Sequence, residues 1–278
     1  MFGQVERVTT VQKILLYLFL AAFSLVMIYP FWFMVVTSLR DSQTFFSDIL
    51  RLAPESFNLN NYVQILTEVN MLQYMQNTAF VTICVVIGQI FTSLMGGYAF
   101  ARLNFPGRDL IFRVYLGTIM IPFVVIMIPM YKMMQVFQWL DRFESLIIPW
   151  IFTAYGTFLM RQFFLGMPKE LEEAALLDGE SRWGILWRIF VPLSGPAIAT
   201  QFTISFLYAW NSFIWPLVAI QSKDHYVATQ GLADIQGAYH AEPPLVMAGA
   251  VLVILPTVLV FILAQRYFVQ GIATTGLK

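Results

Sequence analysis

The chain has 278 residues, of which 59% are hydrophobic and only 12% are charged, and its 16 basic and 16 acidic residues balance. Soluble domains carry roughly 25% charged residues, so this composition indicates an integral membrane protein embedded in a lipid bilayer. Without a basic excess or a long basic block, nothing supports binding to nucleic acid. The single cysteine, Cys84, lies in an apolar run and has no second cysteine for a disulfide.

Six long apolar runs follow one another along the chain. A bilayer core of about 30 Å needs roughly 20 helical residues. Runs of that length, almost free of charge, stand at residues 14–38, 77–101, 110–131, 145–166, 194–220 and 245–265. The sequence therefore predicts an all-α integral membrane protein with six transmembrane helices in a single domain of residues 1–278. The first run is longer than a signal-peptide core of about 7–15 residues, so we expect a retained anchor.

Positive charges indicate the orientation of these spans. With the N-terminus in the cytoplasm, eleven of the 16 lysines and arginines fall in inner segments and five in outer loops. An excess of positive charge on the inner side is the usual bias of membrane proteins. We therefore expect a multi-pass protein with both termini in the cytoplasm, and with the polar segment 167–192, between spans four and five, on the same side.

Several kinds of chemistry have no residues to support them. Asp, Glu, Lys and His are absent from the span interiors, which disfavours an ion-coupled carrier. The sequence has no phosphate-binding G-x-x-x-x-G-K-[ST] motif for ATP hydrolysis. His225 and His240 lack the spacing of a metal site, and the spans offer no pair of nucleophile and base. We therefore expect no catalytic or metal-binding residues, but a membrane path driven by something else.

The residue pattern of the polar segment 167–192 predicts a helical hairpin. Pro168 can open a helix whose first turns hold Glu170, Glu172 and Glu173, where the helix dipole favours acids. Gly179 can end this helix as a left-handed cap. One narrow face, which a groove on a partner could receive, carries Leu171, Ala174, Ala175 and Asp178.

A second short helix is expected to begin at Ser181 and to end at Pro192. Its arginines, Arg182 and Arg188, stay on a polar side. An apolar stripe of this kind beside arginines suits a helix lying at the level of the lipid headgroups. The stripe consists of Trp183, Leu186, Trp187 and Phe190.

The hairpin closely resembles a known signature. The run Glu173-Ala-Ala-Leu-Leu-Asp178-Gly179, followed after nine residues by Ile189 and then Pro192, is similar to the loop of permease subunits of binding-protein-dependent ABC importers. Glu180 and Val191 depart from that pattern, which usually has a small residue and leucine there. Further stretches resemble the carbohydrate-uptake branch of the maltose-permease type, namely residues 98–107, 157–164, 210–217 and 265–271.

The resemblance implies a coupling helix that docks into an ATP-hydrolysing subunit. The docking residues would be Glu173, Ala174, Ala175, Asp178 and Gly179. The implied partners are a second, homologous permease, an extracytoplasmic solute-binding protein facing outer loops 39–76 and 221–244, and two ATP-binding subunits. Those two subunits would hold ATP and magnesium, so this chain needs no cofactor of its own. The implied location is a bacterial or archaeal plasma (inner) membrane.

Residues that contact the solute are harder to select from the sequence. Tyr208, Trp210 and Asn211 combine aromatic faces with an amide on the fifth span, which is chemistry that holds sugars, although packing is an equally open role. Within the resembled branch the solute could be an oligosaccharide, a polyol or a glycerol phosphate. Two other functions stay open: a stand-alone secondary carrier, and a noncatalytic membrane scaffold that docks some other cytoplasmic protein.

Overall fold

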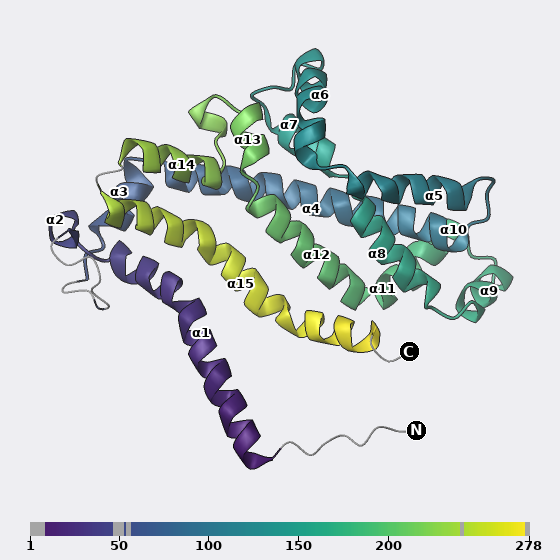
Figure 1. Cartoon of the computed structure of the whole chain (residues 1–278). Coiled ribbons are helices and arrows are strands. Elements are labelled where there is room, and N and C mark those ends of the chain that lie inside the picture. The colour runs from purple at the N-terminus through teal and green to yellow at the C-terminus, as the bar shows by residue number, and fades with distance from the viewer. Residues whose placement is uncertain (1–8, 47–52, 54–56, 240–241, 276–278) are drawn as a thin grey trace. The chain divides into compact units, whose positions relative to one another are not determined.

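The computed structural model describes residues 9–46, 53, 57–239 and 242–275, and every regular element in these ranges is a helix (Figure 1). His240 lies outside the described residues, as do the side chains of 266–271. Within the single domain that the sequence predicts, the packing forms two compact units. Unit 1 comprises residues 1–69 and 235–252, and unit 2 comprises residues 70–234 and 253–278.

Unit 1 begins with the long apolar helix α1 (Thr10–Ser38), followed by the short helices α2 (Ser42–Phe45) and α3 (Asn60–Thr67). Thr9 and Gln12 start α1 with a reciprocal pair of hydrogen bonds, a capping box. At the other end of α1, the side-chain amide of Asn61 donates to the carbonyl oxygens of Ser38 and Arg40, both at 2.9 Å. One amide therefore fixes the end of α1 to α3.

Unit 2 holds most of the remaining helices. Its first is α4 (Met71–Arg102), whose 32 residues extend about 48 Å. The elements that follow are α5 (Arg108–Gly117), η1 (Thr118–Met120), α6 (Phe123–Val136), α7 (Phe143–Ile147), η2 (Ile148–Trp150), α8 (Ala154–Leu165), α9 (Glu170–Leu177), α10 (Arg182–Ile185), η3 (Leu186–Phe190), α11 (Val191–Leu193), α12 (Gly195–Trp210), α13 (Ile214–Ala219) and η4 (Lys223–His225). Two helices pass from one unit to the other, α14 (Ala228–Ala238) and α15 (Pro243–Thr275).

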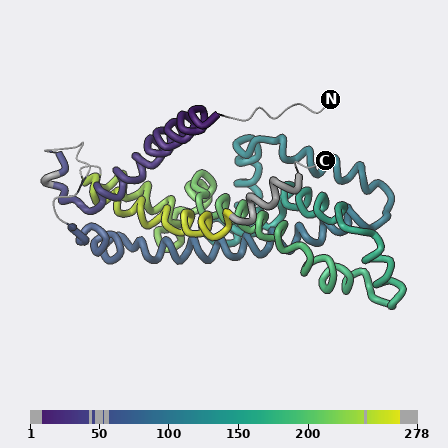
Figure 2. Tube along the Cα trace, turned by 90° about the horizontal axis from the view of Figure 1, so that it is seen from below, coloured from purple at the N-terminus to yellow at the C-terminus, as the bar shows by residue number. Residues whose placement is uncertain are grey.

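The centre of unit 2 is the packing of α4 against α8 and α12 (Figures 1 and 2). Glycine on α4 permits the close approach. A Cβ added at Gly97 would lie 2.5 Å from the side chain of Met160 on α8, and one added at Gly88 would lie 2.6 Å from Ile151. Small residues at helix contacts are the usual means of tight packing in membranes, where the hydrophobic effect does not drive helices together.

Four of the described helical segments are long and apolar enough to cross a membrane: Thr10–Ser38, Met71–Arg102, Phe143–Leu165 and Pro243–Gln265. Two bent pairs raise the number to six if each is one span, as the sequence predicts. The pair Arg108–Met120 and Phe123–Val136 bends by 101° next to Pro122, which pushes Ile121 into extended backbone. The pair Arg182–Leu193 and Gly195–Trp210 bends by 81°.

Two of the six predicted spans, the fifth and the fourth, are not continuous helices. Within 194–220, α12 ends at Trp210 and α13 begins only at Ile214. Within 145–166, residues 151–153 are not helical, and side chains of α4 satisfy the carbonyl groups freed there. The amide of Gln89 donates to the carbonyl of Trp150 at 2.7 Å, and the hydroxyl of Thr92 donates to that of Ile151 at 2.6 Å. Irregular backbone inside a membrane needs such internal partners.

Candidate functional site

The predicted hairpin forms one tip of unit 2, where α9 and α10 follow each other beside the C-terminal end of α4 (Figures 1 and 2). The predicted glycine cap of α9 is confirmed. Gly179 has a φ of +80°, its N–H donates to the carbonyl of Leu176 at 3.1 Å, and the N–H of Glu180 donates to that of Ala175 at 2.9 Å. These two bonds are the Schellman pattern of helix termination. The tip of the hairpin therefore has a defined shape.

The second helix starts as predicted but continues further. The hydroxyl of Ser181 accepts from the N–H of Gly184 at 3.0 Å and caps α10. Pro192 does not end the helix, because residues 186–190 form a π-helical turn and α11 carries the chain to Leu193. The wider π turn accommodates the proline, which would clash with the carbonyl four residues earlier in a regular α-helix.

The apolar stripe of this second helix divides between core and surface. Leu186 and Phe190 are buried in the core of unit 2 together with Ile185. Trp187 stacks on Phe91, with ring centroids 5.7 Å apart. Trp183 is exposed and contacts the edge of the Trp187 ring. Most of the stripe therefore packs against the protein's own helices.

The two faces of α9 differ sharply in exposure. Glu173, Ala174, Asp178 and Gly179 are exposed and stand together on the outward side. Leu177 lies among them with 89% of its surface exposed, although the sequence prediction did not select it. These five residues are called the docking face below, after the role that the resemblance implies for four of them.

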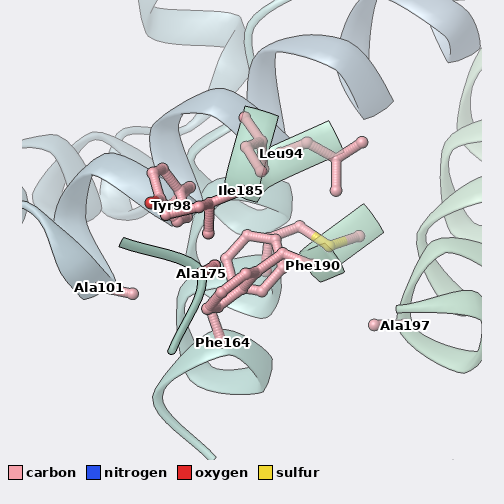
Figure 3. Packing of buried hydrophobic residues seen from close by; sticks show 10 residues of the cluster. Leu94, Tyr98, Ala101, Phe164, Ala175, Ile185, Phe190 and Ala197 are labelled. Atoms are coloured by element: carbon pink, nitrogen blue, oxygen red, sulfur yellow. The ribbon is translucent and has the colours of Figure 1, made fainter. Parts of the chain in front are cut away.

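Ala175, the remaining predicted docking residue, lies on the opposite side of α9 and is only 8% exposed. It belongs to an apolar cluster with Tyr98, Phe164 and Phe190, which Figure 3 shows gathered around it. Its methyl group is therefore covered by α4, α8 and η3, so the structure gives Ala175 a packing role and leaves the other four predicted residues accessible.

Glu172 also points inward, and its contacts were not foreseen from the sequence. Its carboxylate accepts a hydrogen bond from the guanidinium of Arg182 and lies 3.9 Å from the Nε of Arg102. The side chains of Glu172 and Arg102 are 9% and 5% exposed. A charge this deeply buried is tolerated only when it is paired. These three residues are called the inner ionic cluster below.

Glu180, which departs from the signature, turns away from the docking face. Its carboxylate accepts from Arg188 at 2.8 Å and from the N–H of Ser181 at 3.2 Å. The side chain crosses over Gly184, where an added Cβ would lie 1.9 Å from it. The extra negative charge is therefore paired on the second helix of the hairpin.

The three predicted solute residues do not form one site. Trp210 is 5% exposed, and its indole N–H donates to the carbonyl of Val253 at 2.9 Å, as a packing residue does. Asn211 is exposed, and its amide donates to the carbonyl of Leu207 at 2.8 Å within its own helix end. Tyr208 is 52% exposed and lines a pocket beside the ring of Trp150. Of the three, Tyr208 alone lines this pocket.

The opposite end of α4 is fastened to the segment after α13. The amide of Asn77 donates to the carbonyls of Asp224 and Tyr226, each at 2.9 Å. The hydroxyl of Thr78 accepts from the N–H of Ala228 at 2.7 Å, and the amide of Gln73 donates to the carbonyl of Asp224 at 3.1 Å. The start of α4 therefore shapes part of the predicted outer loop 221–244.

Asp141 holds the beginning of the same loop. Its carboxylate accepts from the N–H groups of Gln221 and Ser222 at 3.0 and 2.8 Å and from the Ser222 hydroxyl. Burial acts to raise the pKa of Asp141, but these hydrogen bonds and nearby His225 outweigh it and hold the pKa below its ordinary value of 3.8. The side chain is therefore an ionised clasp between the segments after α6 and α13.

Further along this loop, Lys223 donates to the carboxylate of Asp234 at 2.7 Å. That hydrogen bond and the charge of Asp234 raise the pKa of Lys223. Within the described part of the chain, no group of three or more His, Cys, Asp or Glu side chains could hold a metal ion. The Lys223–Asp234 pair joins the start of this loop to α14.

Comparison with known proteins identifies the family. Residues 88–274 match the family described as binding-protein-dependent transport system inner membrane component. The chain belongs to this family. The arabinooligosaccharides transport system permease protein AraQ of Halalkalibacterium halodurans is 33% identical, over 93% of this chain and 94% of its own. The lactose transport system permease protein LacG of Rhizobium radiobacter is 31% identical, over 91% of each chain.

A solved structure supports the same assignment of fold. A bacterial ABC transporter involved in the import of the acidic polysaccharide alginate contains a chain with a TM-score of 0.81 and 23% identity, covering 96% of this chain and 99% of that one. The resemblance to carbohydrate-uptake ABC permeases is therefore confirmed. This permease is a multi-pass inner membrane component with an all-helical fold.

Proposed function

We propose that this permease forms half of the solute path of an ATP-driven importer for a sugar or related polyol and docks an ATP-hydrolysing subunit through the docking face of α9. The observation that carries the proposal is the exposed face itself. Small Ala174 and Gly179 leave a narrow ridge, and Glu173 and Asp178 flank it with charge. An exposed helix of this shape fits the groove of a partner.

The proposed assembly contains a second, homologous permease, two ATP-binding subunits that hold ATP and magnesium, and an extracytoplasmic solute-binding protein. The family description, which includes dependence on a binding protein, supports the last of these. Both termini and the hairpin then lie in the cytoplasm. ATP hydrolysis occurs on the partner chains, because this chain has no phosphate-binding motif of that kind.

A sugar is the favoured solute class because the relatives named above transport arabinooligosaccharides and lactose. The pocket beside Tyr208 offers the matching chemistry. Its lining residues include Trp150, Tyr208 and Trp215 together with Thr78 and Ser212. The cavity of about 20 Å³ holds no more than a water, so the pocket has to open to admit a sugar. Aromatic faces with a few convergent polar groups are typical of such sites.

The pocket can be tested with a pair of variants. We expect Tyr208→Ala to raise the solute concentration needed for half-maximal uptake while the protein unfolds at the wild-type temperature. Trp210→Phe, which removes the bond to Val253 and shrinks a buried ring, should lower stability and leave that concentration unchanged. The reverse pattern would remove Tyr208 from the solute path and return Trp210 to it.

The assembly is tested by purification from the native membrane. A tagged chain extracted in mild detergent should bring down a second six-span permease and an ATP-binding protein in comparable amounts, identified by mass. Vesicles containing that complex should take up sugar only with the binding protein outside and ATP inside. Recovery of the chain alone, with transport that needs no ATP, would replace this proposal by the secondary carrier. Stable docking without any transport would favour the scaffold.

A further inference from the structure

The inner ionic cluster has no part in the docking face or in the solute pocket. Glu172 faces away from any partner on α9, and the guanidinium of Arg102 lies beneath the helix. A buried carboxylate between two arginines is costly to assemble, because each charge must leave water. Simple packing of α9 would be served by Ala175 and its apolar neighbours alone. The charges therefore call for a separate explanation.

Arg102 joins several elements at a single side chain. As the last residue of α4, it donates through Nη2 to the carbonyls of Phe164 and Met167, both at 2.6 Å. The first of these belongs to the last turn of α8, where orphan carbonyls and the helix dipole favour a cation. The guanidinium carbon also lies 5.1 Å from the centre of the Phe190 ring in η3. The ends of α4 and α8 and the turn of η3 thus meet at Arg102.

Glu172 adds α9 to this junction. One carboxylate oxygen faces Arg102, and the other accepts from Arg182 at the start of α10. Apolar contacts are non-directional and would let α9 slide over its neighbours. An ion pair fixes the position of the helix, because any slide separates a buried charge from its partner.

The geometry points to a positioning role for these residues: Glu172, held by Arg102 and Arg182, is the link that transmits displacement of α9 to the ends of α4 and α8. This inference rests on the proposed docking of α9 to an ATP-hydrolysing subunit. In that assembly the docking face receives the movement of the partner, and the inner ionic cluster passes it to the helices around the membrane path. Glu172 touches neither nucleotide nor solute.

The test is the number of solute molecules imported for each ATP hydrolysed, measured on the assembled complex in vesicles. This ratio does not depend on how much protein folds. Glu172→Gln keeps the size of the side chain and removes its charge, and we expect it to lower the ratio about tenfold while ATP hydrolysis continues. Arg188→Gln is the matched control, because it breaks an ion pair of the same hairpin whose arginine is 76% exposed, and should keep the wild-type ratio. A wild-type ratio in Glu172→Gln overturns the inference.

If the complex that contains Glu172→Gln does not assemble, a second variant tests the inference. Arg182→Gln removes the half-exposed partner of Glu172 and leaves the buried pair of Glu172 and Arg102 in place. We expect its ratio to fall by about threefold, and an unchanged ratio would overturn the inference. Failure of the proposed function looks different, because the wild-type chain would then show no ATP-dependent uptake at all.

Discussion

The two ends of α4 are held by different chemistry. At its N-terminal end, neutral amide and hydroxyl groups of Gln73, Asn77 and Thr78 bond to the backbone of residues 224–228. At its C-terminal end, the charged side chain of Arg102 bonds to the end of α8 and faces Glu172 of α9. Neutral bonds each contribute about 1 kcal/mol, whereas breaking a buried ion pair costs about 3–5 kcal/mol. The first end shapes a loop, and the second joins the ends of α4 and α8 to α9.

The largest effect should come from removing the shared cation. Arg102→Met leaves Glu172 with one half-exposed partner and frees two carbonyl groups, so we expect a loss of about 3–5 kcal/mol in the free energy of unfolding. Urea unfolding in detergent micelles would measure it. Arg188→Gln serves as the control and should cost less than about 1 kcal/mol. Equal losses of unfolding free energy in both variants would show that burial does not strengthen the contacts at the C-terminal end of α4.

Gly179→Asp should separate docking from folding. No atom lies within 4 Å of an added Cβ, so the cost is the left-handed backbone alone, about 1–2 kcal/mol. We expect the membrane fold to persist and ATP-driven uptake to be lost, because the docking face loses its shape. Gly195→Ala, which also has open space but an ordinary φ, should transport normally. Unchanged uptake in Gly179→Asp would contradict the docking role of this cap.

Asn77→Leu should act on the opposite end alone. The variant removes two hydrogen bonds to the segment after α13 and should cost about 1–2 kcal/mol. Amide hydrogen exchange in residues 223–228 should speed up, and the ratio of solute imported to ATP hydrolysed should stay at the wild-type value. A drop in that ratio would mean that both ends of α4 serve coupling.

The smallest effect on stability should come from protonation of the Asp141 carboxylate. Because its folded pKa lies below the ordinary 3.8, ionisation adds stability that is fully present above that value and is lost as the pH falls through the lowered pKa. As the pH falls below about 4, amide exchange at Gln221 and Ser222 should therefore become faster than the intrinsic pH dependence of exchange alone would make it. Asp141→Asn should remove this extra acceleration, and its persistence in that variant would assign it to another group.

Local signals carried the successful part of the sequence prediction. The glycine cap at Gly179 and the hydroxyl cap at Ser181 depend on a few neighbouring residues, and both are present. The spacing of α9 could not tell Ala174 from Ala175, because periodicity says which residues share a face and not which face is covered. Tyr98, Phe164 and Phe190 decide that, and the first lies 77 positions away.

The inner ionic cluster and the breaks in the spans needed the tertiary structure. Glu172 and Arg102 are 70 positions apart, and a predicted first-turn acid gives no hint of a buried partner. Hydropathy depends on composition alone, so it did not predict the interruption of the helix at residues 211–213. A usable signal did exist for the contact between α4 and α12, since Gln89 and Ser93 on α4 are spaced four apart, as are Gln201 and Ser205 on α12. Two polar stripes at that spacing indicate helices that face each other.

Site-specific cross-linking would test the docking of α9 most directly. A photoreactive p-benzoylphenylalanine replacing Leu177, which is 89% exposed on the docking face, should cross-link to the ATP-hydrolysing subunit in the native membrane. The same group replacing Arg188, on the second helix of the hairpin, should not. A cross-link from position 188 without one from 177, or capture of lipid alone from 177, would contradict the account.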